Sequence, residues 1–486
     1  MNNYVLGELK PTEVFKYFEE LSQIPRGSGN EKGISDYLVV FAKNLGLKVI
    51  QDSALNVIIK KPATPGYENA QGVILQGHMD MVCEKNIGTE HDFMKDPLKL
   101  RVDGDFVKAT GTTLGADNGI AVAMGMAIMA SNNVQHPALE LLVTTDEETG
   151  MGGAIGLDAK DVDGRMLINI DSEEEGKLLV SCSGGARGVV TYPITWEKAC
   201  SDLVQYGIRI RGLKGGHSGM EINKGRGNAN KILGRILLDI LDKVDFRLVE
   251  IAGGSKDNAI PREADAVILV SKENESIIEE KINTWNAILS NELRAADKDV
   301  KVILEKSENK ADKMFSKETT NKVINLLYLI PNGINTMSMD IEGLVESSTN
   351  LGVVTTLENE VHFNNAIRSS IKSLKAEILR KFRAVSEALN AKFETSSDYP
   401  EWQYDPNSKI RDYFEDVYEK MYGNKPEIVA IHAGVECGLF KEKFGEIDMI
   451  SFGPNLYDVH TPDEKMSISS VQRSYEYLLE VLKTIK

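Results

Sequence analysis

The stretch VILQGHMDMV at residues 73–82 decides the predicted fold. Its first four residues are uncharged and have the length of a short buried strand, and the polar residues His78 and Asp80 follow directly. Runs of the same kind lie at 56–60, 139–145, 166–170 and 448–452. Helical stretches such as 119–130 separate them. Short buried strands that alternate with helices are typical of a largely parallel α/β sheet.

Polar side chains that can bind metal follow four of these predicted strands. In chain order they are His78 and Asp80, Glu147 and Glu148, Asp171, and His460. Asp117 joins them from a glycine-flanked loop, LGADNG, which opens into the helix predicted at 119–130. In an open α/β sheet the ligand crevice lies outside the carboxyl ends of the strands, so we expect all these side chains to converge there.

The mixture of ligand types indicates the kind of ion. Imidazole nitrogen with carboxylate oxygen, and no thiolate, suits Zn²⁺ or another first-row divalent ion better than Ca²⁺ or Mg²⁺. Two histidines and at least three carboxylates exceed what one tetrahedral catalytic ion needs, and two ions that share a carboxylate would use them all. Taken singly, each residue is more often a helix cap or a surface group. Their combination in five separate segments carries the prediction of a two-metal site.

Composition excludes several classes of protein. The 486 residues are too many for one hydrophobic core, so at least two domains are expected. Acidic side chains outnumber basic ones by 73 to 56, which gives a formal charge of -17 and makes nucleic acid and anionic membrane poor partners. The four cysteines contain no CxxC pair, and the longest apolar stretch, 119–130, is too short to span a bilayer. We therefore expect a cytoplasmic protein.

The pattern changes at about Gly184. Longer alternating strands and amphipathic helices then follow in the order strand, helix, strand, strand, helix, and this order recurs from about Val300. The α/β pattern returns near the C-terminus. We therefore predict a catalytic domain, residues 1–184 and 391–486, interrupted at 185–390 by an α+β domain of two ferredoxin-like halves.

The motifs of this chain are similar to those of a known family. They are GHMDMV at 77–82, LGADNG at 114–119, TDEETGMGG at 145–153, IDSE at 170–173 and HTP at 460–462. Together they resemble the aminoacyl-histidine dipeptidases, which belong with the carnosinases, bacterial carboxypeptidases and amino-acid deacetylases to the co-catalytic zinc peptidases. The resemblance extends over nearly the whole chain. It implies a zinc-peptidase-like catalytic domain with the insert as a lid.

The resemblance also implies a role for each residue of the site. The implied ligands are Asp117, which would bridge two Zn²⁺ ions per subunit, His78 and Asp171 on one ion, and Glu148 and His460 on the other. Co²⁺ or Mn²⁺ could substitute for Zn²⁺. Glu147 would be the general base, whereas the residues alone do not decide between Glu147 and Glu148. Asp80 would orient the imidazole of His78, as carboxylates commonly orient zinc histidines.

The same resemblance implies substrate-binding residues in the insert. His217, in the motif KGGHSG, would stabilise the oxyanion, and Asn258, in GGSKDNAIP, would help to hold the substrate. Arg368 matches the position of an arginine that would hold a free α-carboxylate through both arms of its guanidinium. His432 lies in a segment of small residues, and its role stays open.

The sequence leaves three functions open. The first is hydrolysis of dipeptides, with small peptides as partners and a preference for Xaa-His that only the resemblance implies. The second is deacylation of N-acyl amino acids by the same metals. The third is metal-dependent binding without catalysis, against which Glu147 argues because a binding site needs no base beside its ligands. The chain could act as a monomer or as a homodimer.

Overall fold

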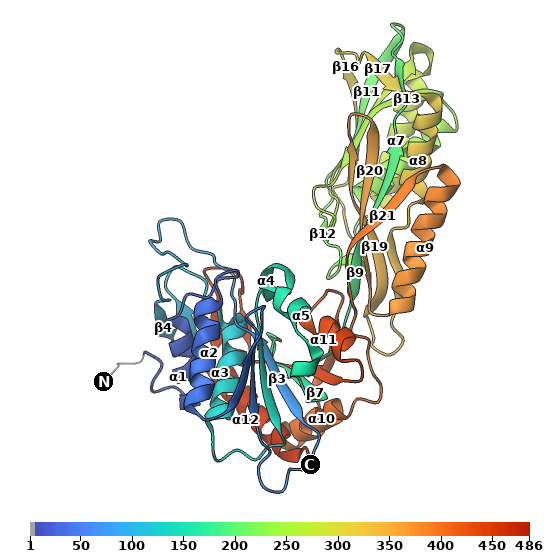
Figure 1. The fold of residues 1–486 in the computed structure, drawn as a ribbon. Coiled ribbons are helices and arrows are strands. Elements are labelled where there is room, and N and C mark those ends of the chain that lie inside the picture. The colour runs from blue at the N-terminus through green and yellow to red at the C-terminus, as the bar shows by residue number, and fades with distance from the viewer. Residues whose placement is uncertain (1–4) are drawn as a thin grey trace. The chain divides into compact units, whose positions relative to one another are not determined.

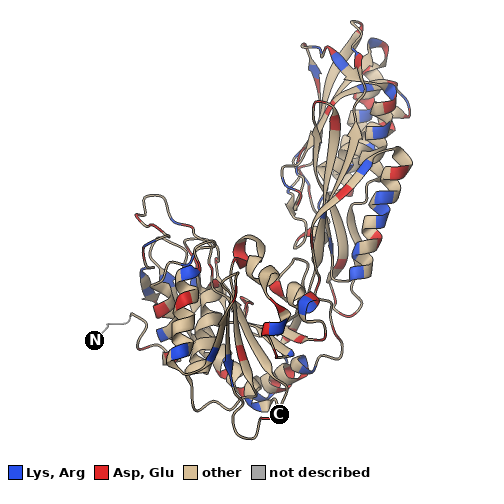
Figure 2. Cartoon of the chain, viewed as in Figure 1, with Lys and Arg blue, Asp and Glu red and all other residues tan. Residues whose placement is uncertain are grey.

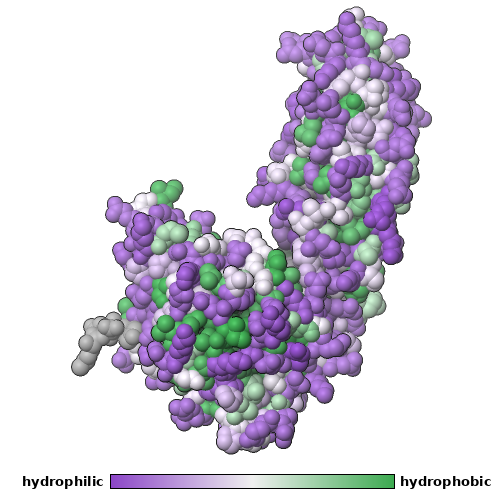
Figure 3. Space-filling model, viewed as in Figure 1, coloured by the Kyte–Doolittle hydropathy of each residue, from purple (hydrophilic) through white to green (hydrophobic). Residues whose placement is uncertain are grey.

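The computed structural model describes residues 5–486, and the contacts within it divide the chain into two compact units (Figure 1). The first unit runs as far as Ser181 and resumes at Tyr404–Ala430 and Val435–Lys486. The second unit contains Cys182–Gln403 and the short segment Ile431–Gly434. Acidic and basic side chains are interspersed along both units in Figure 2, and hydrophilic residues cover most of the face seen in Figure 3. No helix of residues 5–486 combines the length and the apolar character needed to cross a membrane.

An eight-stranded sheet forms the centre of the first unit. Its strand order is β1 (Lys48–Gln51), β2 (Val57–Lys61), β6 (Leu139–Thr144), β3 (Val73–His78), β7 (Met166–Asn169), β23 (Asp448–Ser451), β8 (Lys177–Cys182) and β22 (Glu427–Ile431). The four middle strands, β6, β3, β7 and β23, are parallel, and antiparallel pairs flank them. Every residue of β3, β6 and β7 is buried, which explains why these strands lack polar alternation. The predicted α/β fold is confirmed, with parallel pairing in the centre of the sheet.

Helices pack against this sheet and complete its core. The longer ones are α1 (Thr12–Ser22), α2 (Lys32–Asn44), α3 (Ala116–Ala130), α10 (Lys409–Tyr422) and α12 (Ile468–Thr484). Helix α3 is buried nearly all round, and its small residues let it lie close to the sheet. A Cβ atom on Gly125, for example, would come within 2.3 Å of Leu141 Cδ1 in β6. This close packing fixes α3 and the residues at its N-terminal end.

The second unit is built on one antiparallel sheet. Its strand order is β16 (Lys301–Ser307), β11 (Leu203–Arg211), β15 (Ala264–Ser271), β13 (Phe246–Gly253), β19 (Val345–Thr356), β20 (Glu360–Ser369), β9 (Gly184–Pro193) and β21 (Lys392–Tyr399), and β18 (Gly333–Met337) also pairs with β19. Its longer helices are α6 (Ala229–Leu241), α7 (Glu275–Glu292), α8 (Lys317–Leu329) and α9 (Lys372–Leu389). Figure 1 shows α7, α8 and α9 on the same face of this sheet. Apolar residues of the sheet and the helices form a second core.

The sheet of the second unit consists of two halves with the same order of elements. One half contains β11, α6, β13, β15, α7 and β16, and the other contains β9, α8, β19, β20, α9 and β21. Both have the ferredoxin-like strand order, and they meet where β13 pairs with β19. The halves are nested, whereas the sequence pattern predicts one after the other. The reason is that β9 pairs with β20 and β21, so the whole half that contains β11 to β16 lies between β9 and α8 in the sequence. Strand β21 begins at Lys392, beyond the predicted domain boundary at 390.

The chain enters and leaves the second unit through segments that pair with each other. Cys182 and Trp402 form an isolated antiparallel bridge. The backbone N–H of Cys182 donates to the carbonyl of Trp402 (2.9 Å), and the reverse bond is 3.2 Å long. The two ends of the segment Cys182–Gln403 therefore lie side by side.

Candidate metal centre

The residues predicted to bind metal lie in the first unit, where several of them follow the carboxyl ends of the parallel strands. His78 is the last residue of β3, and Asp171 comes shortly after β7. Glu147 and Glu148 begin the short helix α4 (Glu147–Gly150), which follows β6. Because β6, β3 and β7 are adjacent and parallel, these residues emerge at one edge of the sheet.

Asp117 lies between the two histidines of this centre. It belongs to the first turn of α3 but has non-helical backbone angles, and His460 comes from the loop between β24 (Leu456–Tyr457) and β25 (Lys465–Ser467). Asp117 Oδ1 lies 3.2 Å from His78 Nε2, and Asp117 Oδ2 lies 3.0 Å from His460 Nε2. Each oxygen of one carboxylate thus faces a different imidazole.

The other two carboxylates each approach one of the histidines. Asp171 Oδ1 is 3.5 Å from His78 Nε2, and Glu148 Oε2 is 3.1 Å from His460 Nε2. Ligand atoms of His78, Asp117 and Glu148 lie within 4.8 Å of one another, which is close enough to hold one ion. Among residues 5–486, Glu148 Oε1 finds no hydrogen-bond partner although it is buried, so it can face a cation. The donor set therefore fits divalent metal, with one histidine and one carboxylate on either side of Asp117.

Buried carboxylates crowd this centre and shift the pKa values within it. Burial and the neighbouring Asp117 raise the pKa of Asp171 to about 6. Burial and the neighbouring Asp171 raise the pKa of Glu147 to about 9. Hydrogen bonds with Asp117 and Glu148 raise the pKa of His460 to about 11. Without metal, Asp171, Glu147 and His460 therefore keep their protons to a higher pH than usual. Divalent cations would displace these protons on binding.

Asp80 joins the end of β3 to the start of α4. Its carboxylate accepts hydrogen bonds from the backbone N–H groups of Glu147 (3.1 Å) and Glu148 (3.2 Å) and from Ser28 Oγ (2.8 Å). Its Oδ1 also lies 3.3 Å from His78 Nδ1, at ion-pair distance but without hydrogen-bond geometry. Asp80 thus lies beside the imidazole that it was predicted to orient, and it also positions the two glutamates.

Glu464 fixes the loop that presents Asp117, and sequence reasoning missed it. Its carboxylate accepts hydrogen bonds from four successive backbone N–H groups, those of residues 114–117, at 2.7, 3.0, 2.8 and 3.4 Å. A carboxylate that satisfies four N–H groups holds their loop in one conformation. The available signal in the sequence was the proximity of Glu464 to His460, four residues earlier.

Arg26 and Asn118 are buried and connect segments that carry the metal-binding residues. Arg26 donates to the carbonyl oxygen of Asp80 (3.2 Å). Asn118 Oδ1 accepts from the backbone N–H of His78 (3.2 Å), and Asn118 Nδ2 donates to the carbonyl of Ile170 (2.7 Å). These bonds join groups far apart in sequence, so no local pattern pointed to them.

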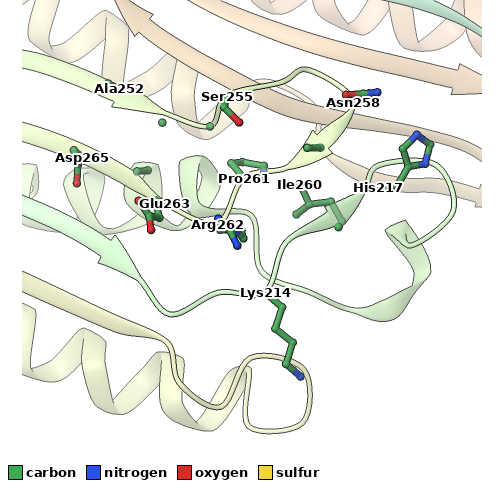
Figure 4. Close-up of a pocket in the computed structure, with 15 residues that line it drawn as sticks. Lys214, His217, Ala252, Ser255, Asn258, Ile260, Pro261, Arg262, Glu263 and Asp265 are labelled. Carbon is green, nitrogen blue, oxygen red and sulfur yellow. The ribbon is translucent and has the colours of Figure 1, made fainter. Parts of the chain in front are cut away.

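The predicted substrate-binding residues lie in the second unit. His217, in β12 (Gly216–His217), and Asn258 line a cavity of about 710 Å³ and lie at the same end of it (Figure 4). The backbone N–H of Ser218 donates to the carbonyl of Asn258 (2.8 Å), which holds the two loops together. Arg368 lies in β20 and does not line this cavity.

Arg368 and His432 offer hydrogen-bond donors or acceptors that no described protein group uses. Arg368 Nη1 donates to the hydroxyl of Tyr399 (3.2 Å), and His432 Nε2 lies 2.7 Å from Ser348 Oγ. Within residues 5–486, Arg368 Nε and His432 Nδ1 are buried without a hydrogen-bond partner. Burial and the charge of Arg368 lower the pKa of His432 to about 3, and the same two causes lower the pKa of His217. The positive charge of Arg368, which contributes to both shifts, would favour the binding of an anion there.

Comparison with known proteins gives consistent results along nearly the full chain. Residues 74–484 match Peptidase family M20/M25/M40. The cytosol non-specific dipeptidase of Escherichia coli (strain K12) is 41% identical over 480 residues, which cover 99% of each chain. The structure of aminoacylhistidine dipeptidase from Vibrio alginolyticus superposes with a TM-score of 0.96 at 43% identity, covering 99% of this chain and 98% of that one. Aminopeptidase PepT from Bacillus cereus, with a TM-score of 0.55 at 15% identity over 98% of this chain and 99% of that one, shares the fold.

Proposed function

Because the chain belongs to peptidase family M20/M25/M40, we propose that it is a metal-dependent dipeptidase whose catalytic centre is the carboxylate and histidine cluster of the first unit. Two relatives of nearly full length, 41% and 43% identical, carry names for dipeptide hydrolysis. The observation that carries the proposal is the position of Asp117, whose two oxygens lie 3.2 and 3.0 Å from different histidines. A carboxylate whose two oxygens face different imidazoles is suited to be shared by a pair of ions.

The proposed centre holds two Zn²⁺ ions, for which Co²⁺ or Mn²⁺ could substitute. Its ligands would be Asp117 on both ions, His78 and Asp171 on one, and Glu148 and His460 on the other. The 3.5 Å and 3.1 Å approaches of Asp171 and Glu148 to the histidines support this division. Nitrogen and oxygen ligands without thiolate favour zinc or a similar ion.

Glu147 is the proposed general base. When bound, two divalent ions polarise the scissile carbonyl and lower the pKa of the attacking water. Glu147 accepts a proton from that water as its oxygen bonds to the carbonyl carbon, and it gives the proton to the leaving nitrogen as the C–N bond breaks. Burial raises the pKa of Glu147 to about 9, and positive charge in the centre would lower it so that the carboxylate can accept a proton near neutral pH.

The substrate-binding role of the second unit is part of the same proposal. Arg368 would bind the free α-carboxylate of the dipeptide, and its unpartnered Nε supports this role. His217 would stabilise the oxyanion, and Asn258 would help to hold the substrate. The imidazole of His432 has a low pKa, about 3, so it would meet the substrate in its neutral form.

A substrate panel tests the activity directly. Purified protein is assayed with Xaa-His dipeptides, other dipeptides and N-acetyl amino acids, before and after complete removal of metal. We expect hydrolysis of dipeptides that requires metal, and little deacylation of the N-acetyl compounds. A wider range than Xaa-His would match the name of the Escherichia coli relative, non-specific dipeptidase, which is also named a cytosol enzyme. On that name we propose a cytoplasmic location.

A further inference from the structure

A buried layer of four polar side chains lies next to the metal centre in the first unit. Its members are Gln76 in β3, Thr144 in β6, Asn169 in β7 and Glu436, the first residue of α11 (Glu436–Phe444). All four are at most 3% exposed. Polar groups in such a position destabilise the fold unless they bond with one another. We call these four residues the polar layer.

The polar layer forms one continuous hydrogen-bonded network. Asn169 Nδ2 donates to Gln76 Oε1 (2.5 Å), and Gln76 Nε2 donates to Glu436 Oε2 (2.7 Å). Thr144 Oγ1 donates to the same oxygen of Glu436 (2.8 Å). A single carboxylate oxygen therefore receives donors from two adjacent strands, and a third strand is joined to them through Gln76.

The polar layer lies directly before the residues that form the metal centre. Gln76 precedes His78 by two positions, and Asn169 precedes Asp171 by two positions. Since side chains in a strand repeat every second residue, Gln76 lies on the same face of β3 as His78. Thr144 is the register partner of His78 and ends the strand that leads to Glu148. The network thus joins the three strands at the points where they present ligands.

Glu436 is the acceptor on which this network ends. An apolar side chain at this position would remove the acceptor of the two short bonds from Gln76 and Thr144. Gln76 Nε2 would keep only its longer bond to Thr144 Oγ1 (3.2 Å), and Thr144 Oγ1 only its longer bond to the carbonyl of Gly77 (3.4 Å). The side-chain bonds that add to the backbone pairing of these strands at their carboxyl ends would then be weakened. An amide oxygen, by contrast, could still accept both bonds.

We propose that Glu436 is a positioning residue of the metal centre, which acts through Gln76 and Thr144 to set the spacing of the strand ends that present His78, Glu148 and Asp171. This inference rests on the proposed function, because it concerns ion affinity and turnover. Loss of a residue that orients metal ligands commonly weakens metal affinity or activity by about 10- to 100-fold. We expect Glu436→Met to weaken Zn²⁺ binding to that extent and to lower kcat. We expect Glu436→Gln to stay close to wild type.

Glu140 provides a matched control at the other end of β6. It is also a buried acid, and its carboxylate accepts hydrogen bonds from the backbone N–H groups of Asp163 (2.9 Å) and Gly164 (2.7 Å). Glu140→Met removes a comparable buried acceptor from the same sheet, away from the ligands. It should lower the melting temperature and leave Zn²⁺ affinity unchanged.

The experiment measures Zn²⁺ binding to chelator-treated protein by calorimetry, together with kcat, KM and the melting temperature of the metal-free form. Thr144→Val, which removes one donor with little change of shape, should weaken Zn²⁺ binding less than Glu436→Met. Gln76→Met combined with Glu436→Met should lose less than the sum of the two single effects, because both break the same bond. If Glu436→Met does not fold, the Zn²⁺ affinity and kcat of Thr144→Val and Gln76→Met test the inference instead.

The inference is overturned by wild-type Zn²⁺ affinity and kcat in folded Glu436→Met, or in both Thr144→Val and Gln76→Met. It is also overturned if Glu140→Met weakens Zn²⁺ binding as strongly as Glu436→Met. Failure of the wild-type protein to bind divalent ions or to hydrolyse dipeptides would instead contradict the proposed function.

Discussion

The polar clusters of the two units have opposite electrostatic requirements. In the first unit, burial and neighbouring carboxylates raise the pKa values of Asp171 and Glu147. In the second unit, burial and Arg368 lower the pKa values of His217 and His432. Burial contributes to all four shifts, and the neighbouring charges add to it: negative charge around the carboxylates of the first unit, and the positive charge of Arg368 around the histidines of the second. One cluster is therefore suited to metal cations and the other to an anionic group such as a substrate carboxylate.

Metal removal changes only the first of these two clusters, and it should have the largest effect on dipeptide hydrolysis. A chelator takes the cations from the first cluster, so dipeptide hydrolysis should fall to background, and added Zn²⁺ should restore it. Initial rates are measured alongside metal content by mass spectrometry. Hydrolysis that persists once the metal content has reached zero would contradict the proposed chemistry.

Substitution of Glu147 tests whether this residue acts as the general base and not as a metal ligand. Glu147→Gln should lower kcat by about 10²- to 10⁴-fold, the usual contribution of a general acid or base. The bound metal should remain, since Glu147 is not among the proposed ligands. Kinetics and metal content are measured on one preparation. A variant that keeps its ions and turns over at the wild-type rate would exclude Glu147 as the base.

Substitution of Arg368 tests the second cluster and should act mainly on substrate binding. Loss of a hydrogen bond to a charged group costs about 1.5–3 kcal/mol, which corresponds to an increase in KM of about 10- to 160-fold for Arg368→Ala. Arg368→Lys keeps the charge but loses the two-armed geometry, so it should recover only part of the loss. A dipeptide with an amidated C-terminus serves as the control. If Arg368→Ala weakens binding of the amide as much as of the free acid, Arg368 does not bind the carboxylate.

The pH dependence of stability gives the smallest expected effect. Asp171 has a pKa of about 6 in the folded metal-free chain against 3.8 ordinarily, and His460 has a pKa of about 11 against 6.5. The folded form therefore binds more protons than the unfolded form, and both groups lower stability as pH rises, Asp171 between about 4 and 6 and His460 above about 6.5. Zn²⁺ displaces these protons, so the gain in melting temperature on adding Zn²⁺ should grow from pH 5 to pH 8. A gain that shrinks with pH would contradict this.

The residues of the proposed metal centre could be picked out from the sequence because most of them lie directly beside a recognisable local pattern. His78 ends a short apolar strand, and Asp117 lies in a glycine-flanked loop before a helix of small residues. Glu464 and Glu436 could not be predicted in this way. Each acts on residues more than 290 positions earlier, and no local spacing records such a bond.

The nested halves of the second unit could not be predicted for a related reason. Strands β9 and β16 have similar alternating patterns, and only their pairing partners assign them to different halves. Strand pairing depends on contacts far apart in sequence, whereas the alternating pattern reports only which face is buried. The order of strands and helices could therefore be predicted from the sequence, but not which of them belong to the same ferredoxin-like half.

The bridge between Cys182 and Trp402 has a consequence for how such a chain can arise. A segment whose two ends are adjacent can be added to a gene, or exchanged for another, without separating the residues on either side of it. The second unit has this property, and one of its halves is in turn enclosed by the other, between β9 and α8. In evolutionary terms the chain has the form of one insertion inside another, both placed within the unit that contains the proposed metal centre.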